Sequence, residues 1–244
     1  MIPATVKRFV HISSFSVYDF RALGFGSTLD ERSPPEARPE QRDAYTWTKI
    51  AQERLVADHC SERGLSLAVI RPGAIYGPGK DWDFGRALRI GPFDLILAPF
   101  SSMRLTHVEN CAAAIVRALD APIDGVFNIV DAQAPSYGAY HRHCRRAGAP
   151  AGFGIYVPWL LVALGGLSIR AVNRLFCKGR ARLPELFDYP RQVARWKPLR
   201  YSNRRAREQL GWTPAVDLDA GIAGMIGIRQ PDPAAITAAK TTTP

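Results

Sequence analysis

The amino-acid sequence predicts an α/β protein built around a doubly wound parallel sheet. Two short runs rich in strand-forming residues, at 8–12 and 66–70, stand on either side of a helical pattern at 43–63. A strand, a helix and a strand in succession indicate a parallel pair joined by a crossover helix. The 244 residues, 47% hydrophobic and 22% charged, suit one globular domain or a domain with a small lobe.

Small residues mark the boundaries of this first unit. The run at 8–12 is followed by Ser13 and Ser14, so we expect its carboxyl end at the two serines. Residues 21–42 are rich in glycine, proline and charge, which is typical of a loop. Gly64 follows the helical pattern and predicts its end, because glycine readily adopts the conformation that closes a helix.

The later elements continue the alternation of helices and strands. The sequence predicts a helix at 109–119, a strand at 125–130, a helix at 136–146 and two short helices at 203–210 and 218–228. The polar end of the chain, residues 231–244, is expected to be a flexible tail.

Charge is unevenly placed along the chain, whose net charge is +10. Between residues 141 and 207 there are fifteen lysines and arginines against two acids. This excess fits a phosphorylated ligand or an anionic membrane surface, and equally a solvated basic face. No nucleic-acid-binding motif accompanies the charge, so no nucleic-acid partner is expected. The four cysteines form no CxxC pair, which favours a cytoplasmic protein with reduced thiols.

An uncharged stretch of 22 residues runs from 148 to 169. Prolines and glycines leave a clean helical pattern only at 158–169, shorter than the roughly 20 residues that span a bilayer. One interpretation is a buried helix or a lid over a substrate. The other is a helix lying on a membrane, because Arg170, Arg174 and Lys178 follow it. A peripheral membrane contact through residues 155–182 is therefore one expected interaction.

The motif that carries chemistry is Tyr45-Thr46-Trp47-Thr48-Lys49. Tyrosine and lysine four residues apart share one face of a helix. A tyrosine hydroxyl ordinarily ionises near pH 10, and a neighbouring ammonium favours the phenolate, so the pair can serve as a general acid/base. Ser14, at the end of the preceding strand, can hold the reacting oxygen. The alternative is an amphipathic helix with an exposed lysine and a half-buried tyrosine.

The surrounding segments resemble the extended short-chain dehydrogenase/reductases, the NAD-dependent epimerase/dehydratase group. The resemblance rests on VKRFVHISSFSVY, YTWTKIAQERLV, LAVIRPGAIYGPG, THVENCAAAIVRAL, GVFNIVD and YSNRRAREQLGWTPAVDLDAGI. It implies an incomplete Rossmann-like doubly wound sheet with a small C-terminal α/β substrate lobe. Residues 1–135 would then form the C-terminal part of the Rossmann-like domain, with minor contributions from later residues. Residues 136–230 would form a mostly helical substrate-binding lobe.

The resemblance also implies roles for single residues. Tyr45 becomes the catalytic acid/base, Lys49 its activator and a ligand of the nicotinamide ribose, and Ser14 the substrate-orienting hydroxyl. Pro72 and Ile75 fall where the family lines the nicotinamide side, so they join Tyr45 and Lys49 as cofactor-binding residues. The implied cofactor is NAD or NADP. No metal site is expected, because His141, His143 and Cys144 have no matching second cluster.

The substrate is expected to be a small molecule with a secondary alcohol, either a sugar nucleotide or sterol-like. Many nucleotide-sugar members carry an asparagine where this chain has Ala74, and the RPGAIYGPG segment also resembles that of 3β-hydroxysteroid dehydrogenases. A homodimer is a further expectation.

The family's glycine-rich GxxGxxG loop has no counterpart in the sequence. That loop carries the dinucleotide pyrophosphate on a helix N-terminus, so NAD(P) binding by these residues alone is in question. Three explanations stand side by side: a start upstream of Met1, a separate chain that supplies the first half, or an inactive remnant. The alternative function is accordingly a truncated, catalytically inactive remnant or interaction module.

Overall fold

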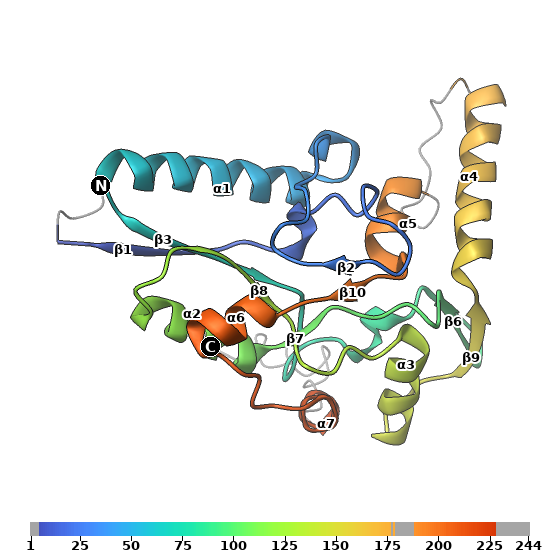
Figure 1. Cartoon of the computed structure of the whole chain (residues 1–244). Helices are drawn as coiled ribbons and strands as arrows, with labels where there is room; N and C mark the ends of the chain where they lie inside the picture. The colour runs from blue at the N-terminus through green and yellow to red at the C-terminus, as the bar shows by residue number, and fades with distance from the viewer. Residues whose placement is uncertain (1–4, 177, 179–187, 228–244) are drawn as a thin grey trace, which may run out of the picture.

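The computed structural model describes residues 5–176, 178 and 188–227, which include a three-stranded parallel sheet (Figure 1). Its strand order is β1-β3-β8, with β1 at Arg8–Ile12, β3 at Ser66–Pro72 and β8 at Gly125–Ile129. The pairing of Ile12 with Ile70 and of Pro72 with Ile129 brings the carboxyl ends of all three strands to one edge. This edge is where parallel α/β sheets bind their ligands.

Helices cover both faces of the sheet, as a doubly wound fold requires (Figure 1). Helix α1 (Ala44–Arg63) lies on one face, whereas α2 (Val108–Asp120) and α6 (Arg204–Leu210) lie on the other. The expected α/β class, doubly wound and Rossmann-like, is therefore confirmed.

The core on the α2 and α6 face is built from small residues against large ones. Ala114 and Ala118 of α2 are fully buried beside Phe127 of β8, and Trp212 closes the cluster after α6. The alanines have no long side chains, so the helix can approach the strands closely and Trp212 can fill the remaining space. On the opposite face, Ile50 of α1 packs in a separate cluster with aromatic residues of the segment after β1.

Three smaller sheets, none of them predicted, surround the main sheet. They pair β2 (Thr28–Leu29) with β10 (Arg200–Tyr201), pair β4 (Ala74–Tyr76) with β7 (Leu105–His107), and join β5 (Leu88–Ile90), β6 (Phe93–Leu97) and β9 (Phe153–Val157) in one sheet. The segment predicted as a loop at 21–42 thus contains β2, together with the short 3-10 helix η2 (Pro39–Gln41). Two further 3-10 helices are η1 (Phe15–Val17) and η3 (Trp82–Gly85).

Four more helices complete the described part of the chain: α3 (Tyr137–Arg146), α4 (Trp159–Phe176), α5 (Tyr189–Trp196) and α7 (Leu218–Gly227). The predicted helix at 158–169 was too short, because α4 continues through Arg170 and Arg174. Both arginines project from exposed positions, so the charges do not interrupt the helix. The tail predicted at 231–244 lies outside the described residues, and the boundary after residue 135 stays a prediction.

Helix α4 stands at one side of the molecule and packs on α5 (Figure 1). The contact is close at Gly166, where a Cβ atom would clash with the Oε1 atom of the buried Gln192. The neighbouring Gly165 meets nothing within 4 Å. Only one of the two glycines is therefore required for packing.

We expect Gly166→Ala to lower the free energy of unfolding by about 1–3 kcal/mol, because the new methyl group must displace a buried side chain. Gly165→Ala, on the open side of the same helix, should instead stabilise the protein by roughly 0.5–1 kcal/mol through helix propensity. Urea unfolding of the two variants measures both values. Equal effects of the two substitutions would contradict the close α4–α5 contact.

Candidate active site

The first turn of α1 is held in place by its N-cap. The side chain of Asp43 accepts a hydrogen bond from the backbone N–H of Thr46 at 2.7 Å and one from its hydroxyl at 3.1 Å. At the other end, Gly64 adopts a left-handed conformation, with φ of 62°, and closes the helix as predicted. The cap fixes the start of the helix, so Tyr45 falls in the first turn and Lys49 in the second.

Lys49 reaches from α1 to the end of β1. Its Nζ atom donates a hydrogen bond to the carbonyl oxygen of Ile12 at 3.0 Å. Ser14 lies two residues further along, and its Oγ atom accepts from the N–H of Ser16 at 3.1 Å. The structure therefore brings Lys49 and the Ser14 segment together at the carboxyl end of β1.

Hydrogen-bonding groups without a partner among the described residues remain at the carboxyl end of β1. An ammonium has three N–H donors, and Lys49 uses one of them on Ile12. The hydroxyl of Ser13 is buried and has no hydrogen-bond partner in the described part of the chain. Lys49 is only half-buried, so its remaining donors can reach a bound molecule, whereas the Ser13 hydroxyl lies below the surface.

The other predicted residues lie around the same edge of the sheet. Tyr45 is 55% exposed, Pro72 is buried at the end of β3, and Ile75 on β4 is 39% exposed. An exposed tyrosine in the turn before Lys49 leaves room for a substrate beside its hydroxyl.

An ion pair holds α1 against β3 one turn beyond Lys49. Arg71 donates two hydrogen bonds to Glu53, Nε to Oε1 at 2.8 Å and Nη2 to Oε2 at 2.6 Å, and its guanidinium stacks over the Tyr18 ring. Burial alone would lower the pKa of Arg71, but the paired Glu53 raises it above the ordinary value. This two-pronged contact fixes the helix that carries Tyr45 and Lys49.

His11 on β1 lies close enough to the charged side chains of Lys49 and Glu53 for its pKa to be affected. Burial is the main reason why the pKa of His11 lies below its ordinary value, and the Lys49 ammonium lowers it further. The Glu53 carboxylate acts in the opposite direction. The two charged side chains of α1 thus lie within electrostatic range of β1.

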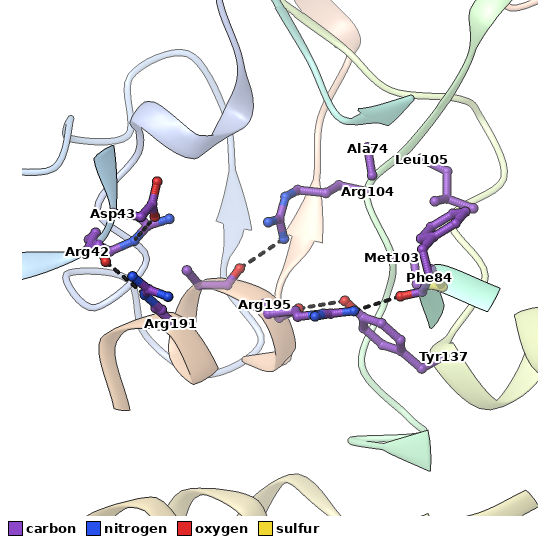
Figure 2. Close-up of a pocket in the computed structure, with 11 residues that line it drawn as sticks. Arg42, Asp43, Ala74, Phe84, Met103, Arg104, Leu105, Tyr137, Arg191 and Arg195 are labelled. Carbon is purple, nitrogen blue, oxygen red and sulfur yellow. Dashed lines mark hydrogen bonds and ion pairs between the residues drawn. The ribbon is translucent and has the colours of Figure 1, made fainter. Parts of the chain in front are cut away.

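A cavity of about 520 Å³ opens next to the start of α1 (Figure 2). Its volume is typical of a small-molecule site. It is lined by Arg42, Asp43, Ala74, Phe84, Met103, Arg104, Leu105, Tyr137, Arg191, Ala194 and Arg195. None of the five predicted site residues lines it, but Asp43 precedes Tyr45 by two residues and Ala74 is next to Ile75.

Four arginines dominate one side of the cavity, and apolar side chains dominate the other (Figure 2). Arg104 donates to the Ala194 carbonyl at 3.0 Å, and Arg195 donates to the Phe84 carbonyl at 2.7 Å. Neither forms an ion pair with a carboxylate in the part of the chain that the structure describes. Arg42, by contrast, lies near Glu36 and Asp43.

The arginines repel one another across this space. Burial lowers the pKa of Arg42, Asp43 and Glu36 oppose this effect, and the nearby Arg104 adds to it. An anion in the cavity would relieve the repulsion. Sequence reasoning singled out none of these arginines individually, although the basic excess at 141–207 included Arg191 and Arg195.

Comparison with known proteins shows what the chain is similar to. Residues 1–93 match the model of the NAD dependent epimerase/dehydratase family. The chain is 28% identical to the 3beta-hydroxysteroid-dehydrogenase/decarboxylase isoform 1 of Arabidopsis thaliana, over 91% of this chain and 53% of that protein. It is also 28% identical to the UDP-glucose 4-epimerase of Vibrio cholerae, over 50% of this chain and 37% of that one.

The N-terminal third of the chain thus matches the NAD dependent epimerase/dehydratase family, and the chain as a whole is similar to members of the extended short-chain dehydrogenase/reductases. Its fold matches the UDP-glucuronic acid 4-epimerase of Bacillus cereus solved with NAD, with a TM-score of 0.59 and 17% identity over 90% of this chain and 60% of that one. The UDP-glucose 4-epimerase of Thermotoga maritima gives 0.61 and 17%, over 91% and 63%. The chain spans about half the length of the first of these curated relatives.

The polar groups at the strand end are of a kind that can bind the hydroxyl groups of a nucleotide. The remaining donors of Lys49 fit a ribose, which presents hydroxyl groups. The described residues hold no group of three or more histidine, cysteine or acidic side chains that could bind a metal ion.

We predict that Lys49→Met raises the pKa of His11, because it removes a cation that disfavours the protonated ring. Histidine NMR signals followed across pH, with His11→Gln for assignment, measure the shift. Lys80→Met, an exposed lysine on another segment, is the matched control and should leave the titration unchanged. A His11 titration insensitive to Lys49→Met would contradict the placement of the ammonium beside β1.

Proposed function

We propose that this chain carries the proton-transfer centre of an NAD(P)-dependent oxidoreductase or epimerase acting on a secondary alcohol. Tyr45 would exchange a proton with the alcohol oxygen, Lys49 would favour its phenolate form, and Ser14 would orient the oxygen. The observation that carries the proposal is the hydrogen bond from Lys49 to the Ile12 carbonyl. It ties the ammonium to the end of β1, one helical turn from the Tyr45 position.

NAD or NADP would supply the hydride chemistry when bound. Within this chain, Tyr45, Lys49, Pro72 and Ile75 are the residues proposed to face its nicotinamide half. Lys49 has donors for the ribose, and the buried Pro72 and half-exposed Ile75 offer apolar surface to a ring. The dinucleotide pyrophosphate would need the glycine loop that the sequence lacks, so the alternative of a catalytically inactive module stands beside the proposal.

Tyr45→Phe tests the proposed role of the phenol. It removes the proton donor while leaving the ring, so we expect turnover to fall roughly 10²- to 10⁴-fold with nucleotide binding retained. Turnover is followed as formation of the epimer with UDP-glucose and UDP-glucuronic acid, and as NAD reduction with a 3β-hydroxysteroid. Binding is followed by calorimetric titration of NAD.

The matched control is Tyr156→Phe, which removes the hydroxyl of another exposed tyrosine, on β9. Full turnover of the Tyr45→Phe protein would refute the assignment of the acid/base. Absence of NAD binding by the wild-type chain would favour the inactive module instead.

We further propose that the substrate is anionic, which favours a sugar nucleotide over a sterol. The support comes from Arg104 and Arg195, whose guanidiniums face the cavity without a carboxylate partner among the described residues. Guanidinium groups bind phosphate oxygens in a planar, two-pronged geometry. A neutral sterol would leave these charges uncompensated, whereas a diphosphate would pair with them.

Arg104→Gln should weaken the binding of UDP to the chain by about tenfold or more, since hydrogen bonds to charged groups contribute roughly 1.5–3 kcal/mol. Isothermal titration calorimetry gives the dissociation constants. Arg32→Gln serves as control, because Arg32 is a fully exposed arginine paired with Asp30 away from the cavity. Unchanged UDP affinity in Arg104→Gln and Arg195→Gln would exclude these arginines from substrate binding.

A further inference from the structure

Helix α4 buries only a narrow stripe of its surface. Val162, Gly166 and Asn173 are the buried residues among the 18 of this helix. The opposite side carries large apolar side chains, of which Leu164 is 50% and Leu175 is 76% exposed. A helix of an ordinary globular protein shows the reverse arrangement, with its apolar side facing the core.

The β5-β6-β9 sheet also has an uncovered apolar face. Ile90 pairs with Phe93, and Phe93 pairs with Phe153, so the three side chains lie on one face of the sheet. All three are exposed, Phe153 by 61%. The rings of Phe93 and Phe153 lie 6.5 Å apart. Leu88 and Ile155 extend the same face by the alternation of side chains along a strand.

The two features adjoin each other. Only Pro158 separates the end of β9 at Val157 from the start of α4 at Trp159, and β6, β9 and α4 lie along one side of the molecule (Figure 1). We call this combination the apolar surface: Leu88, Ile90, Phe93, Phe153 and Ile155 of the sheet with Leu160, Leu161, Leu164, Leu167 and Leu175 of α4. Large apolar side chains left exposed in this number on two successive elements are typical of a surface that binds a partner.

Positive charge accompanies the apolar surface. No aspartate or glutamate occurs between residues 132 and 184, whereas arginines and lysines recur through the segment. Arg170 and Arg174 project from exposed positions of α4. The Arg145 guanidinium lies over the Phe153 ring, 5.0 Å from its centre, so a cation is directly in contact with the apolar sheet face.

We propose that the apolar surface binds the face of an anionic phospholipid bilayer. Apolar side chains would enter the boundary between headgroups and acyl chains while the arginines contact lipid phosphates. By length and composition α4 could cross a membrane. It is nevertheless docked on α5 along its buried stripe and carries two arginines within its 18 residues, which favours a helix lying in the interface.

The charge pattern distinguishes a membrane from a second copy of the chain. A symmetric pair joined through this surface would bring two surfaces of the same positive charge together. A bilayer containing anionic lipid instead supplies the opposite charge over the whole area. The proposal therefore commits to lipid and makes self-association an outcome of the test.

Sedimentation of the full chain with lipid vesicles provides the test. We expect the protein to bind vesicles of phosphatidylcholine mixed with phosphatidylserine, to bind pure phosphatidylcholine much less, and to lose binding as salt is raised. Equal binding to both lipid compositions, or no binding to anionic vesicles at low salt, would overturn the proposal.

Paired substitutions locate the binding surface. Leu164→Glu with Leu175→Glu on α4, and separately Ile90→Glu with Phe153→Glu on the sheet, should each weaken vesicle binding by roughly tenfold or more, because buried apolar area is lost. Leu55→Glu with Val116→Glu is the matched control, since both residues are exposed apolar side chains on α1 and α2.

Each outcome has a defined meaning. If either test pair binds vesicles like wild type while remaining folded by circular dichroism, the proposed surface is wrong. Arg170→Gln with Arg174→Gln keeps the leucines and should reduce the preference for anionic lipid; an unchanged preference would contradict the charge argument. Lipid-free dimers that dissociate in Leu164→Glu, seen by analytical ultracentrifugation, would assign the surface to self-association instead.

Discussion

The contact between α1 and the parallel sheet is the constraint on which the site depends. It is made at two successive turns, where Lys49 donates a hydrogen bond to the Ile12 carbonyl and Glu53 accepts two hydrogen bonds from Arg71. These contacts join the helix to two neighbouring strands, β1 and β3. A helix fixed at both points cannot rotate about its axis, so Tyr45 is held at the edge where the strands end.

The same constraint explains why part of the site could be read from the sequence. Tyr45 and Lys49 lie on one helix, and Ser14 lies just beyond the end of a strand, so the local sequence pattern was enough to assign each residue to its element. The limits of β1 and α1 were predicted almost to the residue because serines and Gly64 mark them. The roles of Ser14, Tyr45, Lys49, Pro72 and Ile75 stay predictions, as does the homodimer.

The cavity could not be predicted in this way. Its arginines come from the loop before α1, from the segment before β7 and from α5, and only the tertiary fold brings Arg42, Arg104 and Arg195 together. The small sheets were missed for a similar reason. Strands of two or three residues, such as β2 and β10, leave no periodic pattern and exist through pairing with distant partners. The length of α4 was underestimated because arginines were taken as its end.

Helix α5 lines the cavity on one side and packs against α4 on the other. Arg191 and Arg195 face the cavity, whereas Gln192 is pressed against Gly166 of α4. This short helix therefore separates the cavity, with its four arginines, from the exposed apolar side of α4. The position of Arg191 and Arg195 in the cavity thus depends on the same helix that packs against α4.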